Sequence, residues 1–399
     1  MTMHEQRGSL GPADMRLANE WSVLSYLREH GAVSASSAAA ATGLSRPTAN
    51  SALASLQSSG LAAPSGIRTG NAGRAPRLWT PRYDAGWVIS VDVGVEWVRL
   101  ALADLSGTLH DRRRAPSADS DAAGLIAQIG TMVTELARDN GLPTEDILSI
   151  TIGSPGSYDP REKRLRLAPN LPMWERSAVV DRLAELLGDV VQLENDIDLA
   201  AVGEQAAGAG RGVTDFAYLS VGHGVGMGLV LGGKLHRGGH GTAGEVGFLP
   251  LGEVDDVPSA KVRHRGMLEA ATASDALLAH ARKRGLRRVR SPEQLFEVAR
   301  GGDGTALEVV RREAQLLARG LAAVIVLVDP QLVVLGGGVG RNGGDLLLPP
   351  LREHLENLLP LPLPQLTVST AGDDATLTGG VALATQVAWP RAVRRTAKP

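Results

Sequence analysis

The sequence predicts an α/β protein in which a small helical domain precedes a larger domain of strands and helices. Its 399 residues are too many for one ordinary domain and indicate two or three. Residues 13–59 show only the helical spacing of apolar side chains. Short apolar runs typical of buried strands begin near residue 88, and residues 81–86 are the predicted linker between the two regions.

The composition indicates a cytoplasmic protein. The absence of cysteine excludes disulfides and every thiolate metal site. No secretion signal is visible, and the longest apolar run, residues 321–328, is too short to span a membrane. The net charge is −2, yet residues 1–84 contain eight Arg and five acidic residues, a balance of +3. This asymmetry favours a nucleic-acid partner for the N-terminal region.

The N-terminal region predicts three helices in a helix-turn-helix arrangement. A helix over residues 13–30 is followed by a short alanine-rich helix over residues 34–42 and a turn at Gly43. The third helix begins after the N-cap residue Ser45 and extends to about residue 59. Three short helices alone are common in proteins that do not bind DNA, so the segment that follows them matters.

That segment, residues 64–82, predicts a β-hairpin wing with four arginines and no acidic residue. In winged helix-turn-helix domains the first turn of the third helix enters the major groove, and basic side chains nearby contact phosphates. We therefore expect residues 1–84 to bind double-stranded operator DNA. The predicted contacts are Ser45, Arg46, Thr48, Asn50 and Ser51 on the helix, and Arg68, Arg74 and Arg77 on the wing.

Strands and helices alternate in the rest of the chain. Strands over residues 88–93 and 98–103 precede an amphipathic helix over residues 122–140 and a strand over residues 147–152. Residues 219–249 form a glycine-rich stretch within an apolar surrounding. Because glycine adopts positive φ freely and exposes the backbone, this stretch predicts two short strands whose turns are open to a ligand.

Four motifs occur in order along this larger domain: Asn-Leu-Pro-x-Trp at 170–174, Glu-Asn-Asp at 194–196, the glycine stretch ending in Glu245, and three glycines at 336–338. Together they resemble the ROK family of sugar kinases and of the transcriptional regulators derived from them. The resemblance implies a two-lobed actin-like ATPase (ribonuclease H-like) fold. Its first lobe would comprise residues 85–199 with the C-terminal helix 375–390, and its second lobe residues 200–374.

The resemblance also implies which residues line a sugar site. In the kinases, the Asp of Asn-Asp takes the proton from the sugar hydroxyl, and here it matches Asp196. Several acids and amides in one cleft suit a polyol, whose hydroxyls both donate and accept hydrogen bonds. An isolated Asp, Asn or Glu is more often a cap or turn residue. The predicted effector-binding residues are Asn170, Asn195, Asp196, Glu245 and Glu269.

Departures from the family pattern argue against catalysis and against a metal. The family's zinc site uses three Cys and a His, but this chain has no Cys, and Phe248 stands at the His position. We expect no metal site, and we expect Phe248 to hold its loop by packing. The phosphate-binding motif reads Asp-Val-Gly and then Val95-Glu96, which adds bulk and negative charge, and His223 replaces a hydroxyl donor. We expect no cofactor.

The sequence thus predicts a transcriptional regulator, a repressor of carbohydrate-related genes, controlled by a sugar or sugar-phosphate effector. A homodimer or homotetramer without a membrane partner is expected, since symmetric pairs read operator half-sites. The alternatives are an ATP-dependent sugar kinase with an appended DNA-binding domain and a ligand-independent DNA-binding protein. The basic residues at 282–290 are predicted to form a solvated helix end, and those at 391–398 a disordered tail.

Overall fold

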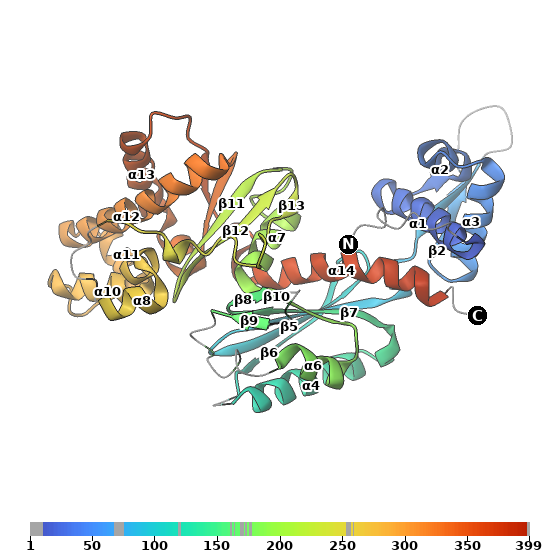
Figure 1. Ribbon diagram of the computed structural model, residues 1–399, viewed down its shortest axis with the longest axis horizontal. Coiled ribbons are helices and arrows are strands. Elements are labelled where there is room, and N and C mark those ends of the chain that lie inside the picture. Colours follow the sequence, from blue (N-terminus) through green and yellow to red (C-terminus); the bar gives the residue numbers. More distant parts are fainter. Residues whose placement is uncertain are drawn as a thin grey trace.

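The computed structural model contains an N-terminal head and two lobes, which are connected by a long C-terminal helix (Figure 1). It describes residues 11–67, 76–118, 121–159, 162, 164–167, 171, 174, 178–252, 257 and 259–396. In this part of the chain, no helix is both long and apolar enough to cross a membrane.

The head consists of three helices and a small antiparallel sheet. Ser34 and Ser45 cap the second and third helices, because the side chain of each accepts a hydrogen bond from a backbone N–H inside its helix. Leu24, Leu27 and Leu53 are fully buried between the helices. The three predicted helices and the hairpin are confirmed. The elements are α1 (Pro12–His30), α2 (Ala35–Thr42) and α3 (Arg46–Ser58), with β1 (Val33–Ser34), β2 (Ala62–Ile67) and β3 (Arg77–Pro81) in the order β1-β3-β2.

The first lobe is built on a five-stranded sheet in the order β10-β7-β4-β5-β6. Strand β6 was not predicted, because its Arg112-Arg113-Arg114 run breaks the apolar alternation that marks a strand in the sequence. As an edge strand, β6 can expose these charges. The strands are β4 (Trp87–Val93), β5 (Trp97–Asp104), β6 (Leu109–Pro116), β7 (Ile147–Ser154) and β10 (Val191–Asn195); α4 (Ala122–Asp139) and α6 (Val179–Leu187) accompany them, and β8 (Ser157–Asp159) pairs with β9 (Arg164–Arg166).

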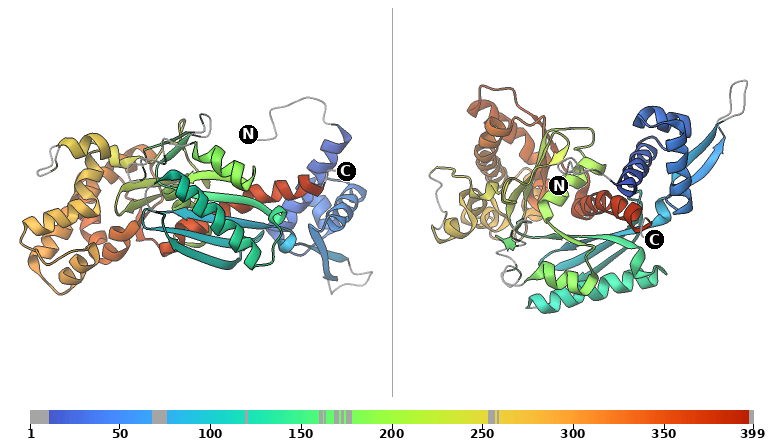
Figure 2. Two further views of the ribbon diagram at one scale, coloured as in Figure 1. Left: turned by 90° about the horizontal axis from the view of Figure 1, so that it is seen from below. Right: turned by 45° about the vertical axis from the view of Figure 1, so that its right-hand side comes forward.

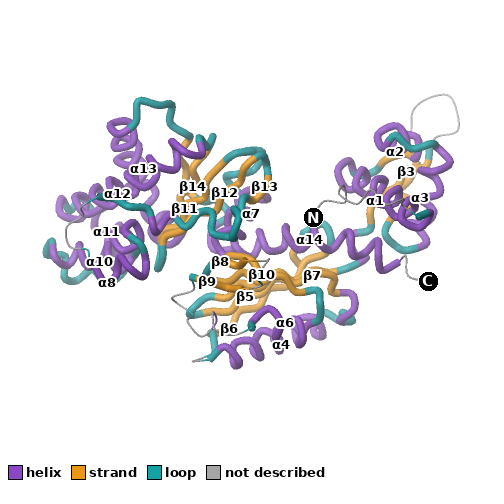
Figure 3. The backbone as a smooth tube through the Cα atoms, viewed as in Figure 1, coloured by secondary structure: helices purple, strands orange, loops and turns teal. Residues whose placement is uncertain are grey.

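The second lobe repeats this sheet, with the order β13-β12-β11-β14-β15. In both sheets the first strand in the chain is central, with an antiparallel pair on one side and a parallel pair on the other. Figure 3 shows the sheets and the helices around them. The elements are β11 (Phe216–Val221), β12 (Val225–Leu231), β13 (Lys234–Leu235), β14 (Leu332–Gly336), β15 (Gln365–Val368), α8 (Ser259–Arg265), α9 (Met267–Thr272), α10 (Ser274–Lys283), α11 (Pro292–Arg300), α12 (Gly304–Val328) and α13 (Gly337–Leu358); four short 3₁₀ turns lie at Tyr83–Ala85, Thr144–Asp146, Val246–Phe248 and Gly372–Asp374.

Two helices, α7 (Asp196–Ala207) and α14 (Ala375–Thr396), cross between the lobes (Figures 1 and 2). Glycine makes this close crossing possible: a Cβ on Gly379 would lie 1.8 Å from the carbonyl oxygen of Leu199, and one on Gly203 would lie 2.0 Å from that of Ala375. The predicted boundary between residues 199 and 200 falls inside α7.

The C-terminal helix is longer than predicted, and the expectation of a disordered basic tail is wrong for residues 391–396. Arg391 donates to the carbonyl oxygens of Leu148 and Asp189 at 2.9 and 3.0 Å, and Arg395 donates to that of Glu145 at 2.6 Å. These hydrogen bonds hold the last turns of α14 against the first lobe, and the helix continues to Thr396. Lys398 lies outside the described residues.

Candidate functional site

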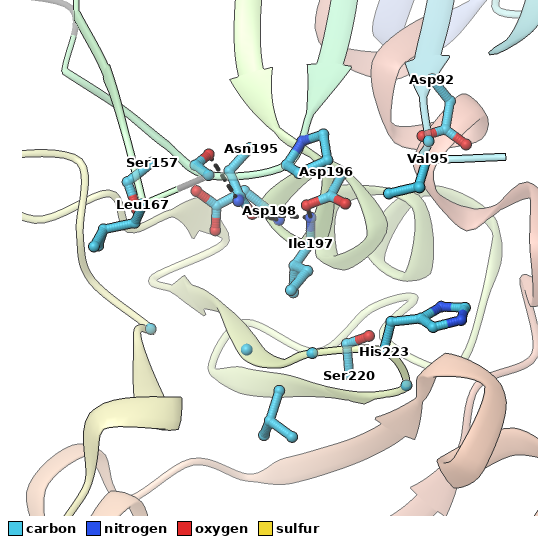
Figure 4. Close-up of a pocket in the computed structure, with 18 of the residues that line it drawn as sticks. Asp92, Val95, Ser157, Leu167, Asn195, Asp196, Ile197, Asp198, Ser220 and His223 are labelled. Atoms are coloured by element: carbon cyan, nitrogen blue, oxygen red, sulfur yellow. Dashed lines mark hydrogen bonds between the residues drawn. The ribbon is translucent and has the colours of Figure 1, made fainter. Parts of the chain in front are cut away.

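A cleft of about 1020 Å³ lies between the two lobes (Figure 4). Its lining comes from the β4–β5 turn, the start of α7, the glycine turn between β11 and β12, the loop before α8, and the 3₁₀ turn that precedes α14. Four of the five predicted effector residues line it: Asn195, Asp196, Glu245 and Glu269. Asn170 lies outside the described residues.

Asp196 occupies the first position of α7, directly after β10. One of its carboxylate oxygens accepts the backbone N–H of Ile197 at 2.9 Å. Burial raises the pKa of Asp196 to about 7, the negative charge of Asp92 adds to the rise, and hydrogen bonds from the backbone oppose it. The side chain can therefore take or give a proton near neutral pH.

Asn195 is the N-cap of α7. Its side-chain oxygen accepts the backbone N–H groups of Ile197 and Asp198, both at 2.9 Å, and its amide nitrogen donates to the carbonyl oxygen of Gly156 at 3.1 Å. Its side-chain oxygen is thus already bound by two backbone N–H groups of α7. For this residue the structure supports the capping role more than a ligand role.

Glu245 and Glu269 approach the cleft from the second lobe with different local roles. Glu245 accepts a hydrogen bond from the hydroxyl of Ser157, and burial raises its pKa. Glu269 accepts the backbone N–H of Val225 at 2.8 Å and the Nε–H of Arg265 at 2.6 Å. Both of its oxygens therefore have partners, and it fixes the glycine turn that begins β12.

The opposite end of the cleft combines bulky and acidic side chains with the basic residues Arg112, Arg113 and Arg114 of β6, which also line it. Val95 is 57% exposed and lines the cleft beside Glu96, and the exposed His223 lies on the glycine turn facing it (Figure 4). The carboxylate of Asp92 is bound by Arg99, whose Nε lies 2.9 Å from it. The bulk of Val95 and the charge of Glu96 thus lie in the cleft, and the Asp92–Arg99 ion pair is an addition that was not predicted.

Phe248 does not hold its loop by packing, so this expectation is wrong. The side chain is 45% exposed and lines the cleft, where its ring offers an apolar surface to a ligand. Backbone contacts hold the loop: the N–H of Met227 donates to the carbonyl oxygen of Gly244 at 2.9 Å, and Gly266 fits directly against Gly247. Within the described ranges, no group of three or more His, Cys, Asp or Glu side chains could hold a metal ion.

Several cleft residues were missed by sequence reasoning. Ser157 binds Glu245 across the lobes, and Leu167, 41% exposed, lines the cleft with a φ of 57°, a left-handed conformation rare for this residue type. Arg99 could have been found, since it faces Asp92 in the β4–β5 register. Asp198 could also have been found, because it shares the first helical turn with Asp196.

The predicted DNA contacts lie on one helix and on the hairpin of the head. Arg46, Asn50 and Ser51 are exposed on α3. The hydroxyl of Ser45 accepts the backbone N–H of Thr48 at 3.2 Å and also contacts its hydroxyl. Arg77 is exposed on β3, 4.9 Å above the ring of Trp79. Arg68 and Arg74 lie outside the part of the chain that the structure describes.

The duplicated sheets and the polar cleft define a two-lobed protein of the sugar-kinase type that carries an additional N-terminal head. The chain belongs to the ROK family, whose profile matches residues 88–387.

Its relatives include a kinase and a repressor. It is 31% identical over 283 residues to the glucokinase of Thermotoga maritima, covering 67% of this chain and 86% of that protein. It is 25% identical over 352 residues to the xylose repressor of Caldicellulosiruptor bescii, covering 85% of this chain and 87% of the repressor. The structure of a ROK family transcriptional regulator, a homolog of the E. coli MLC protein, matches its fold with a TM-score of 0.81 at 20% identity, covering 96% and 99% of the two chains.

Proposed function

We propose that the protein is a DNA-binding transcriptional repressor whose two-lobed domain binds a sugar or sugar phosphate as an effector without phosphorylating it. The observation that carries this proposal is the path of α14. The helix begins at the cleft and ends against the head, so a ligand between the lobes and a DNA molecule on the head would act on the same rigid element.

At the cleft, the turn that precedes α14 is tied to both lobes. Asp374 forms an ion pair with Arg112 of β6, and Asp373 forms one with Arg341 of α13. Arg99 of β5 also donates to the backbone oxygen of Asp373 at 2.7 Å. A change in the distance between the lobes must therefore strain or break these contacts at the start of α14.

At the head, α14 packs against α1. The Trp389 side chain is fully buried, donates to the carbonyl oxygen of Leu105 at 3.0 Å, and lies under Arg28 of α1. We infer that the effector shifts the head through this contact and so changes the separation of two heads in a homodimer or homotetramer. Such coupling requires that ligand and DNA prefer different lobe arrangements.

The head itself supports DNA binding. The first turn of α3 is capped, polar and exposed, and the hairpin β2–β3 lies beside it in the sequence position of a wing. The related xylose repressor is matched over most of its length, which favours a DNA-binding head and an effector-binding two-lobed domain here as well.

The decisive experiment measures binding of the full chain to the DNA upstream of its own gene, by fluorescence anisotropy with and without sugars and sugar phosphates. We expect tight, salt-dependent binding that at least one sugar weakens. Binding that no sugar changes, together with unchanged thermal stability, would leave the ligand-independent alternative. The absence of any specific DNA binding would overturn the proposal.

A second candidate function, an ATP-dependent sugar kinase, is favoured by one observation. Asp196 stands at the family position of the base, and its pKa of about 7 suits proton transfer near neutral pH. The test is turnover of hexoses with ATP and magnesium, with Asp196→Asn as the control. We expect no turnover above this control, because Val95, Glu96 and the Asp92–Arg99 pair occupy the phosphate end.

A further inference from the structure

Within the described part of the chain, three acidic side chains in the cleft have no hydrogen bond or ion pair with a basic side chain. Asp196, Asp198 and Glu245 all line the cavity, the first two from one turn of α7 and the third from the loop before α8. Asp198 is only 5% exposed, and its carboxylate has no hydrogen-bond or ion-pair partner among the residues that the structure describes. A buried, unpartnered carboxylate that faces a cavity indicates a missing partner.

Three arginines of the two lobes near this group of acids are already engaged. Each forms an ion pair with a different carboxylate: Arg99 with Asp92, Arg237 with Glu194, and Arg265 with Glu269. Among the residues that the structure describes, no arginine is therefore paired with the acidic trio of Asp196, Asp198 and Glu245.

The three carboxylates repel one another and lack full solvation as long as they are ionised. Burial raises the pKa of all three groups. The negative charges of Glu194, Asp196 and Glu245 raise the pKa of Asp198 further, whereas the positive charge of Arg237 lowers it. In the same way, Asp92 and Glu245 raise the pKa of Asp196, and Glu269 raises that of Glu245. A bound cation would relieve this repulsion, a neutral ligand would leave it, and a phosphate placed here would increase it.

We propose that the preferred effector is an amino sugar, whose protonated amine lies among Asp196, Asp198 and Glu245 while the ring occupies the remainder of the cleft. This inference rests on the proposed function, because it names the chemical class of the effector for the same cleft. An ammonium group has three N–H donors and no acceptor, which matches three carboxylates that otherwise repel one another. The exposed faces of Phe248 and Leu167 supply apolar surface for the ring carbons.

The test compares sugars that differ at one substituent. Full-length protein is titrated calorimetrically at pH 7.5 with D-glucosamine, D-glucose and N-acetyl-D-glucosamine, and with the galactose and mannose counterparts of each. We expect at least one free amine to bind about tenfold more tightly than its hydroxyl and N-acetyl counterparts. The heat should also depend on the ionisation enthalpy of the buffer, because binding of the ammonium form changes the protonation of both the carboxyls and the amine.

Asp198→Asn should reduce the preference for the amine to about threefold or less, whereas Glu135→Gln, which neutralises an exposed acid on α4, should leave it unchanged. Neutral sugars that bind as well as the amines, with no effect of Asp198→Asn, would overturn the inference and leave the proposed function intact. Binding of calcium or magnesium chloride alone, with the same dependence on Asp198, would reassign the trio to a metal cation. If no sugar binds and none alters DNA affinity, both proposals fail.

Discussion

The guanidinium of Arg28 lies 5.0 Å from the centre of the Trp389 ring and so joins α1 of the head to α14. It also lies 5.8 Å from the ring of Trp21, and burial lowers the pKa of Arg28. Cation–π contacts gain strength when they are desolvated. This contact and the Arg112–Asp374 ion pair therefore mark the two ends of one helix, one at the DNA-binding head and the other at the ligand cleft.

The ion pair at the cleft end of α14 should control coupling rather than folding. We expect Arg112→Ala to reduce the effect of a bound sugar on DNA affinity by about threefold or more, because coupling energies of this kind amount to about 1–3 kcal/mol. Anisotropy titrations with and without sugar measure this change. Arg138→Ala is the control, since Arg138 pairs with Asp139 inside the first lobe and does not line the cleft. Equal behaviour of the two variants would contradict the role of α14.

Substitutions in the head should separate base contacts from phosphate contacts. We expect Arg46→Ala to weaken binding to the cognate operator by about 1–3 kcal/mol and to relax sequence preference, because Arg46 lies in the first exposed turn of α3. Arg77→Ala should weaken binding to all sequences and lower the salt slope by about one unit. Titrations at several salt concentrations distinguish these effects. If neither change affects binding, α3 is not the recognition helix.

The acidic trio predicts that stability depends on pH. The pKa of Asp198 is raised in the folded state, so the folded protein holds its proton more tightly than the unfolded chain does. The stability that the protonated Asp198 side chain contributes is fully present below its unfolded pKa of about 3.9, and it is lost as the pH rises through the folded pKa. We expect Asp198→Asn to be more stable than wild type at pH 8 by about 1–2 kcal/mol, and by less at pH 5.

Urea unfolding at the two pH values measures this difference, with Glu135→Gln as the control. A difference between Asp198→Asn and wild type that does not vary with pH would show that the change acts through packing and not through charge.

The crossing of α7 and α14 should tolerate no side chain at Gly379. A Cβ there would overlap the carbonyl oxygen of Leu199, so Gly379→Ala must push the helices apart. We expect a loss of about 1–3 kcal/mol in the free energy of unfolding, or more if the lobes separate. Gly304→Ala is a matched control in the first turn of α12, where a Cβ meets nothing within 4 Å. A neutral effect of Gly379→Ala would show that the helices cross less closely.

Local patterns were enough to predict the head helices and the central strands of both sheets. The caps at Ser34 and Ser45 and the apolar spacing of α1 depend only on neighbouring residues. Such patterns failed for β6, because an edge strand has no need of apolar alternation. They also failed at the end of α14, where the carbonyl groups that order Arg391 come from residues about 200 positions or more earlier.

For the site, the sequence by itself pointed to two of the acids that line the cleft, since Asp196 and Glu245 stand in recognisable motifs at the end of a strand and of a glycine loop. Only the tertiary structure decided what each of them does. Asn195 and Glu269 have their side-chain oxygens bound by nearby groups, whereas the carboxylate of Asp198 has no hydrogen-bond partner among the described residues. The Arg112–Asp374 pair joins residues 262 positions apart. The reason is physical: hydrogen bonds and charge pairing depend on distance in space, which is set when the two lobes and α14 pack together.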